Sequence, residues 1–118
     1  MKLEPTLDII PSLLFPFDIN SDQDETVENL IAKTDINNDD ELTHLFNTLI
    51  KPEFTKRIIS EQQWYIDTLT FFLNKNEKFN RVFSEITTYF SEEPIDKRHF
   101  MSVLLECLKN TKLHNKPD

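Results

Sequence analysis

Apolar residues between Pro52 and Phe90 recur at helical spacing on two consecutive segments. In the first segment, a set of mainly apolar residues recurs at spacings of three and four, which places them on one face of a helix. They are Ile58, Ile59, Gln62, Tyr65, Ile66, Leu69, Phe72 and Leu73. The polar sequence Asn74-Lys75-Asn76 follows it. A second stripe then comprises Phe79, Val82, Phe83, Ile86 and Phe90, with Tyr89 at its flank. The pattern predicts two amphipathic helices joined by a polar turn.

The first of these helices is apolar on a second side as well. Trp64 and Phe71 are seven residues apart, so they lie two turns above one another, opposite the main stripe. We expect another segment of the chain to cover this pair. The alternative is a contact with a partner, because Trp and Arg dominate the anchors of protein interfaces and Arg57 and Lys75 flank the pair.

Residues 1–20 place Pro5, Pro11 and Pro16 among many apolar side chains. Proline at this spacing disfavours a regular helix and biases the preceding residues toward extended geometry. We therefore predict an extended, Pro-rich N-terminal strap that packs on the helices and covers Trp64 and Phe71. In the alternative, part of the strap docks into a partner.

Three further helices are predicted from start signals and periodicity. Ser21, followed by acids, is a start signal for a short helix, and a second helix should run from about Asp39 to Ile50, where Pro52 ends it. A last helix should begin near Pro94 to Asp96. Their expected buried residues are Val27, Leu30 and Ile31 in the first, Leu42, Leu45, Phe46, Leu49 and Ile50 in the second, and Phe100, Val103, Leu104, Cys107 and Leu108 in the last.

These elements predict an all-α fold, a single small bundle of about five helices with the extended Pro-rich N-terminal strap. The 118 residues are the size of one domain. The chain has no glycine, which disfavours tight hairpins and favours Asn, Asp and Pro connections between helices. We divide it into the strap at 1–20, a helical domain at 21–110 and a frayed tail at 111–118.

The formal net charge of −8 comes from one block of sequence. Between residues 18 and 41 there is one base, Lys33, and nine acids: Asp18, Asp22, Asp24, Glu25, Glu28, Asp35, Asp39, Asp40 and Glu41. Such a field repels nucleic acid and anionic lipid and favours encounter with a basic protein. In the simpler interpretation, the acids only complement helix dipoles and maintain solubility.

Candidate catalytic and metal chemistry is sparse. Without glycine there is no phosphate-binding loop of the Walker or dinucleotide type. Residues 35–41 resemble a calcium loop, but Asp40 stands at the glycine position and Phe46 at the closing glutamate position. His44 follows Asp40 and Glu41 by one turn, which is typical of a helix surface, and Cys107 lies on a buried stripe. We expect no enzyme activity, no cofactor and no metal.

The function we predict is that of an acidic protein-binding inhibitor, immunity-like or antitoxin-like, which neutralises a basic toxin or nuclease by covering its active or nucleic-acid-binding surface. The residues expected to bind this partner are Asp22, Asp24, Glu25, Glu28, Asp39, Asp40, Glu41, Trp64 and Phe71. The alternative is a helical adaptor or structural subunit that forms a homo-oligomer or joins a larger complex. A single cysteine and the lack of a membrane-spanning apolar run lead us to expect a cytoplasmic protein.

Overall fold

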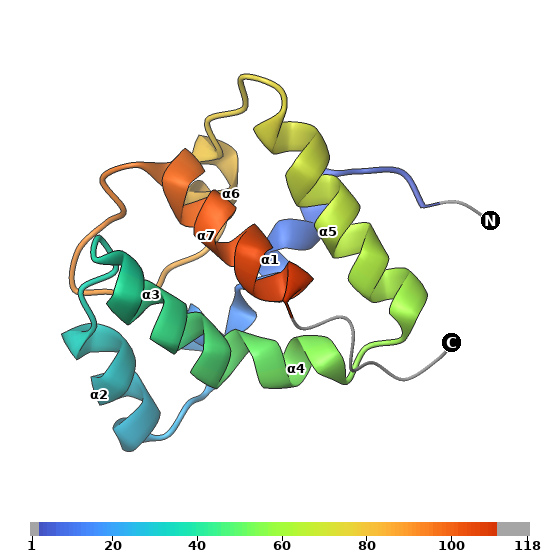
Figure 1. Ribbon diagram of the computed structural model, residues 1–118. Helices are drawn as coiled ribbons and strands as arrows, with labels where there is room; N and C mark the ends of the chain where they lie inside the picture. The colour runs from blue at the N-terminus through green and yellow to red at the C-terminus, as the bar shows by residue number, and fades with distance from the viewer. Residues whose placement is uncertain (1–2, 111–118) are drawn as a thin grey trace.

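The computed structural model describes residues 3–110, and this part of the chain is an all-α bundle (Figure 1). It contains no strand, only one isolated β-bridge. The helical elements, with 3₁₀ and π turns marked η, are in chain order η1 (Leu7–Ile9), α1 (Ile10–Leu13), η2 (Phe15–Phe17), η3 (Ile19–Ser21), α2 (Glu25–Lys33), α3 (Asp39–Leu45), η4 (Phe46–Ile50), α4 (Lys51–Thr55), α5 (Ile59–Leu73), α6 (Asn80–Ser84) and α7 (Lys97–Lys109).

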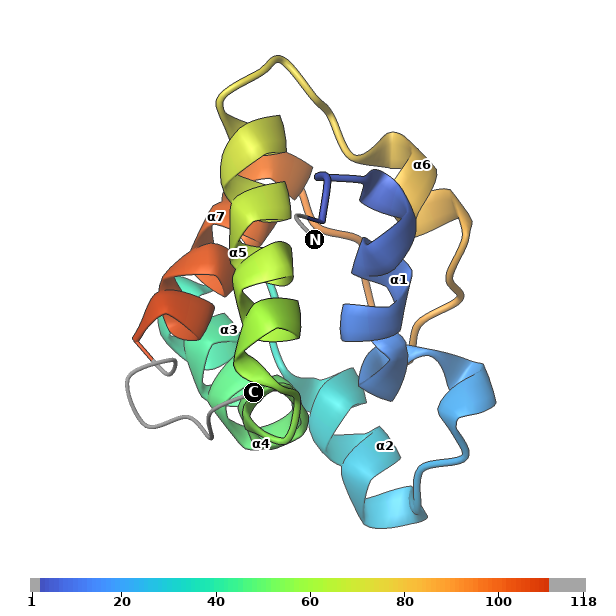
Figure 2. The same ribbon diagram turned by 90° about the vertical axis from the view of Figure 1, so that its right-hand side faces the viewer.

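The core lies between the N-terminal segment and the helices that pack on it, which are α5, α7 and the continuous helical stretch from α3 to α4. α7 packs along α5 and also contacts α3 and α4 (Figures 1 and 2). A chain of aromatic rings links these elements: the ring centroid of Phe46 is 5.2 Å from that of Phe100 and 6.0 Å from that of Phe17, and Phe90 contacts both Phe17 and Phe100. The contacts of Phe100 with Phe46 and Phe90 are edge-to-face, and pairs in this geometry stabilise a core beyond the area that they bury.

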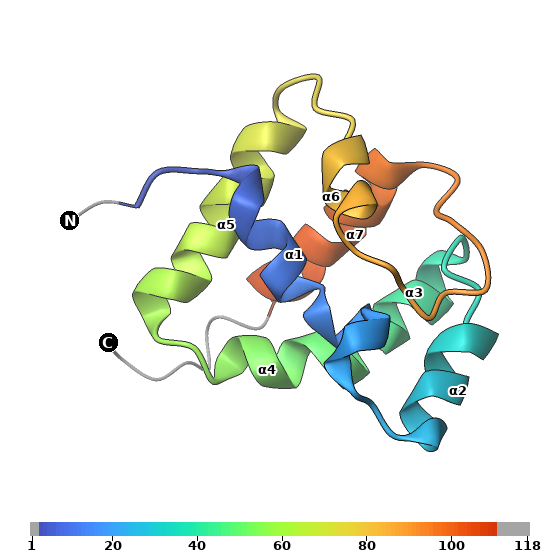
Figure 3. The same cartoon turned by 180° about the vertical axis from the view of Figure 1, so that it is seen from behind.

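From residue 7 onward the N-terminal segment is mostly helical, so the prediction of an extended strap is wrong for this stretch. It forms the short turns η1, α1, η2 and η3 and crosses the molecule on the side opposite α7 (Figure 3). Pro11 and Pro16 each occupy the second residue of a helical element, where the missing backbone N–H would have no partner within the helix. Four side chains of the segment are buried in the main core: Ile10, Leu13, Leu14 and Phe17.

The second predicted helix does not end at Pro52. Helical structure continues from Asp39 through η4 to Thr55, with Pro52 as the second residue of α4. The turn before it is a π turn, closed by the hydrogen bond from the Lys51 amide to the Phe46 carbonyl. This wider turn moves the preceding carbonyls away from the proline ring, with which they would clash in a regular α-helix.

The long helix α5 therefore starts at Ile59, later than the sequence pattern suggested. Ile58 and Ile59 were expected to face inward but are 48% and 40% exposed, because the chain is extended at Ile58 just before the helix begins. The remainder of the stripe agrees with the prediction. Gln62, Tyr65, Ile66 and Leu69 are buried, and Phe72 and Leu73 pack partly against the core.

The helix predicted from the stripe between Phe79 and Phe90 forms only in part. Only Asn80–Ser84 is helical, and Thr87 to Tyr89 runs antiparallel to the N-terminal segment through an isolated bridge between Asp18 and Thr88. The Ile19 amide donates to the Thr87 carbonyl at 2.8 Å, and the Tyr89 amide donates to the Phe17 carbonyl at 2.9 Å. β-branched and aromatic residues favour such extended pairing, and helical periodicity alone could not reveal it.

Three α-helices in residues 3–110 begin with a side-chain cap. Asp24 accepts a hydrogen bond from the Val27 amide, Asn38 from the Glu41 amide and Asp96 from the His99 amide. These contacts satisfy amide groups that have no partner within the helix. The predicted start of α3 is confirmed, whereas α2 begins after Asp24 and not at Ser21.

The last helix runs from Lys97 to Lys109, and its predicted inward face is confirmed: Phe100, Leu104, Cys107 and Leu108 are buried, and Val103 is partly buried. Within the described part of the chain, no helix combines the length and apolar character that spanning a bilayer requires. The tail predicted at 111–118 lies outside the described residues.

Candidate functional site: an acidic surface around Asn37

The acidic block of sequence divides into two groups in the fold. The first group surrounds the start of α2, where Asp22, Asp24 and Glu25 are exposed and Glu28 is half-buried. Asp18 is buried, and its carboxylate accepts hydrogen bonds from the backbone and side-chain amides of Asn20. Asp18 therefore stabilises the local turn.

Three of these acids influence Tyr89. Partial burial, followed by the negative charges of Glu28, Asp22 and Asp18, raises the pKa of the Tyr89 hydroxyl above its usual value. That hydroxyl donates a hydrogen bond to the Ile19 carbonyl at 3.1 Å. The N-terminal segment, the start of α2 and the extended stretch at 87–89 thus meet at one place.

The second group lies in the loop between α2 and α3 and in the first turn of α3. The Asp35 amide donates to the Glu41 carboxylate at 3.0 Å, and the Asn37 amide donates to the Asp35 carboxylate at 3.0 Å. Of the residues that suggested a calcium loop, Asp35 and Glu41 are therefore engaged in local turns. Asp40 and Glu41 line a surface groove between α2 and α3 together with Lys33 and His44.

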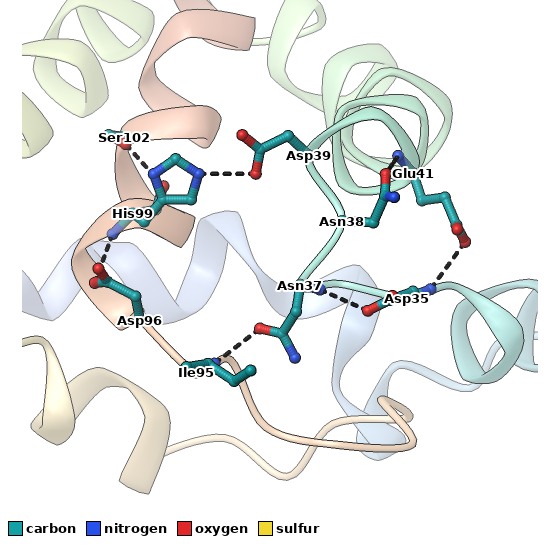
Figure 4. A network of polar contacts seen from close by, with 9 residues as sticks. All are labelled: Asp35, Asn37, Asn38, Asp39, Glu41, Ile95, Asp96, His99 and Ser102. Carbon is teal, nitrogen blue, oxygen red and sulfur yellow. Dashed lines mark hydrogen bonds and ion pairs between the residues drawn. The ribbon is translucent and has the colours of Figure 1, made fainter.

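Asn37 joins this second group to a distant segment of the chain, shown in Figure 4. Its side-chain amide nitrogen donates to the Glu92 carboxylate at 3.2 Å and to the Glu93 carbonyl at 3.3 Å, while its Oδ1 accepts the Ile95 amide hydrogen at 2.8 Å. The loop that precedes α7 is thereby held against the start of α3.

His99 makes a second link between the same segments. Its Nε2 lies 2.8 Å from the Asp39 carboxylate, and its backbone amide is bound by Asp96 (Figure 4). Local sequence gives no sign of this contact, because Asp39 and His99 are 60 residues apart.

The two links bring together what we call the acidic face, a set of five exposed acidic residues: Asp35, Asp39, Glu92, Glu93 and Asp96. Glu92, Glu93 and Asp96 lie outside the acidic block and were missed by the sequence analysis. Of the two bases at the start of α7, Lys97 lies over the Phe83 ring and lines a depression together with Glu93, and Arg98 binds backbone carbonyls at and just after the end of α5.

The two acidic groups are separated by the length of α2. Its nine residues span about 13 Å at 1.5 Å per residue. Exposed charges this far apart are largely screened from each other at physiological ionic strength, where the Debye length is about 8 Å. Asp22, Asp24 and Glu25 therefore form one negative surface, and the acidic face forms another.

Trp64 and Phe71 have different environments. Trp64 is half-buried, and its indole N–H donates to the Glu4 carbonyl at 2.7 Å, so the N-terminal segment does meet this side of α5. Phe71 is 42% exposed, packs edge-on against Phe72 and has the Lys75 ammonium over its ring. The N-terminal segment, which we expected to cover both residues, thus contacts Trp64 but leaves much of Phe71 exposed.

The groups considered for chemistry do not form a reactive constellation among the described residues. Burial is the largest influence on the Cys107 thiol and raises its pKa, although the nearby Lys51 charge opposes the effect. No group of three or more His, Cys, Asp or Glu side chains in residues 3–110 is placed to hold a metal ion.

Comparison of the chain with protein-family models, with curated proteins and with solved structures gives no match. Any functional proposal therefore depends on the geometry and charge described above.

Proposed function

We propose that this protein is a non-enzymatic inhibitor that binds a basic protein partner through the acidic face. In this proposal it acts as an immunity-like or antitoxin-like protein and neutralises a toxin or nuclease by covering its active or nucleic-acid-binding surface. The observation that carries the proposal is that two distant segments bring five exposed acidic residues together around Asn37 and His99.

The chemistry is that of phosphate mimicry. Carboxylates of Asp35, Asp39 and Asp96 would occupy positions that substrate phosphates take against Lys and Arg of the partner. Their negative field would accelerate encounter, and the first acidic group at the start of α2 would extend the attraction to a neighbouring part of the partner.

Preorganisation supports this role. The backbone around Asn37 is fixed by its bonds to Glu92, Glu93 and Ile95, and α7 begins directly after this loop. A partner would bind a surface whose backbone is already ordered, so less conformational entropy would be lost on association.

A matched pair of charge variants tests the proposal. The first step is to purify the partner from the native host and measure its association rate with the pure protein at 50 and 300 mM NaCl. We expect a basic partner and a steep fall in the association rate as the salt concentration rises.

The variant Glu92→Lys/Glu93→Lys should lower the affinity far more than Asp67→Lys/Glu106→Lys. The second pair is the control, because it changes the net charge by the same amount at exposed positions elsewhere. Equal effects of the two pairs, or a partner that binds a neutral surface, would contradict the proposal.

The alternative function, a helical adaptor or homo-oligomeric subunit, is favoured by a different observation. Ile58 and Ile59 are adjacent, exposed apolar residues at the start of α5, and Phe71 is exposed near its end. In this case multi-angle light scattering should find an oligomer whose size is unchanged between low and high salt, and Ile58→Ser/Ile59→Ser should dissociate it.

A further inference from the structure

Ile95 is much more exposed than any other large apolar side chain in residues 3–110. Its relative exposure is 88%, whereas the next most exposed large apolar side chain, that of Ile58, is 48% exposed. A single exposed apolar residue is common on protein surfaces and needs no explanation by itself. The surroundings of Ile95 make it unusual.

The backbone at Ile95 is held on both sides. Its amide donates to Asn37 Oδ1, the preceding Pro94 is buried, and the following Asp96 caps α7. The isoleucine side chain therefore projects from a fixed position, and little backbone entropy would be lost if a partner packed against it.

A surface depression of about 260 Å³ lies beside Ile95. Apolar residues Ile36, Leu42, Pro94 and Phe100 line it, together with polar groups of Asn37, Asp96 and His99. Its volume is below the roughly 300 Å³ at which pockets for whole small molecules begin, so its size suits an inserted side chain. Asp96 is itself one of the lining residues, and the Asp39 carboxylate lies 2.8 Å from Nε2 of the lining residue His99.

We infer that Ile95 and this depression form the apolar anchor of the acidic face, and that the partner presents a Lys- or Arg-rich segment carrying a large apolar side chain. The inference depends on the proposed function and specifies which part of the partner binds the acidic face. The cationic side chains would pair with Asp39 and Asp96 on the side of the depression, because Lys78, Lys97 and Arg98 line the other side of Ile95. The apolar side chain would pack on Ile95 and enter the depression. Charge would then set the rate of encounter, and burial of the apolar side chains would slow dissociation.

Two synthetic helical peptides of equal positive charge test the inference. Both carry Lys and Arg on one face; the first has Leu on the other face and the second has Ala. Fluorescence anisotropy with the full-length protein, at 50 and 300 mM NaCl, gives the affinities. We expect the Leu peptide to bind at least tenfold more tightly than the Ala peptide at both salt concentrations.

Variants of Ile95 then locate the anchor. Ile95→Ser should weaken binding of the Leu peptide about tenfold and leave the Ala peptide unchanged, whereas Ile95→Leu should retain the affinity. Ile58→Ser is the control, because it removes an exposed isoleucine from the start of α5 and should have no effect. Circular dichroism establishes that each variant is folded.

The outcomes separate this inference from the proposed function. If Ile95→Ser leaves Leu-peptide binding unchanged, or if Ile58→Ser weakens it equally, the inference is overturned while salt-dependent binding to the acidic face still stands. If light scattering shows a dimer that Ile95→Ser dissociates, then a second copy of this chain packs on Ile95, and the inference is again overturned. If neither peptide binds more tightly at low salt, and Glu92→Lys/Glu93→Lys has no effect, the proposed function itself is wrong.

Discussion

Nη2 of Arg98 donates a hydrogen bond to the Leu73 carbonyl at 2.6 Å, so the first turn of α7 closes the end of α5. The other guanidinium nitrogen, Nη1, donates to the carbonyls of Lys75 and Glu77 at 2.9 and 2.7 Å. One planar cation thereby satisfies three carbonyl groups at a helix end and in the loop that follows, where backbone oxygens have no partner within the helix.

The first prediction follows from these three hydrogen bonds. Arg98→Ala should lower the free energy of unfolding by about 2–3 kcal/mol, because hydrogen bonds to charged groups are stronger than neutral ones. Arg98→Lys should recover only part of this loss, since an ammonium cannot reproduce the planar fork. Urea unfolding measures both variants, with Lys97→Ala as the neighbouring control. A loss no greater than that of the control would contradict the role.

The contact between Trp64 and Glu4 makes a second prediction. Trp64→Phe keeps an aromatic ring but removes the indole donor, so the free energy of unfolding should fall by about 1 kcal/mol. Amide hydrogen exchange of residues 4–9 should accelerate at the same time, because the start of the N-terminal segment loses its attachment to α5. Phe71→Leu, at a 42% exposed position, serves as the control and should leave this exchange unchanged.

The third prediction concerns Thr68, which is completely buried on α5. Its hydroxyl has no hydrogen-bond partner among the described residues. Thr68→Val keeps the shape of the side chain and removes a polar group from an apolar site, so it should stabilise the protein by about 1 kcal/mol. This corresponds to an increase of about 4 °C in Tm for a chain of this size. Thr70→Val is the matched control, since that hydroxyl does donate to the Ile66 carbonyl. A lower Tm for Thr68→Val would show that the hydroxyl contributes to stability.

The raised pKa of Cys107 predicts how stability changes with pH. The folded thiol holds its proton above the usual pKa of 9.0, because burial disfavours the thiolate. Well below pH 9 both folded and unfolded states are protonated, so this stabilising contribution is complete there. As pH rises above 9, the unfolded chain releases the proton first and the folded state loses relative stability.

Cys107→Val isolates this effect, because all other residues are the same in both proteins. Chemical unfolding at pH 7, 8, 9 and 10 should show the wild type losing stability relative to the variant only at the upper end of the range. Parallel profiles for the two proteins would mean that the folded and unfolded thiols have the same pKa.

The local pattern of the sequence determined several elements correctly. The inward faces of α3 and α7 and the buried middle of α5 follow from apolar residues at helical spacing, a property of residues three and four positions apart. The turn after Leu73 and the start of α3 follow equally from nearby polar residues. The excess of acids between residues 18 and 41 is also a property of the sequence alone.

Contacts between distant residues decided the rest. The N-terminal prolines fit into helical turns because apolar neighbours such as Leu14 and Phe17 are buried by the core, and residues 87–89 are extended because they pair with that segment. The acidic face exists because Asn37 binds Ile95 across 58 residues and His99 meets Asp39 across 60. Periodicity and local charge contain no information about such pairs, since only packing of the whole chain brings them within hydrogen-bond distance.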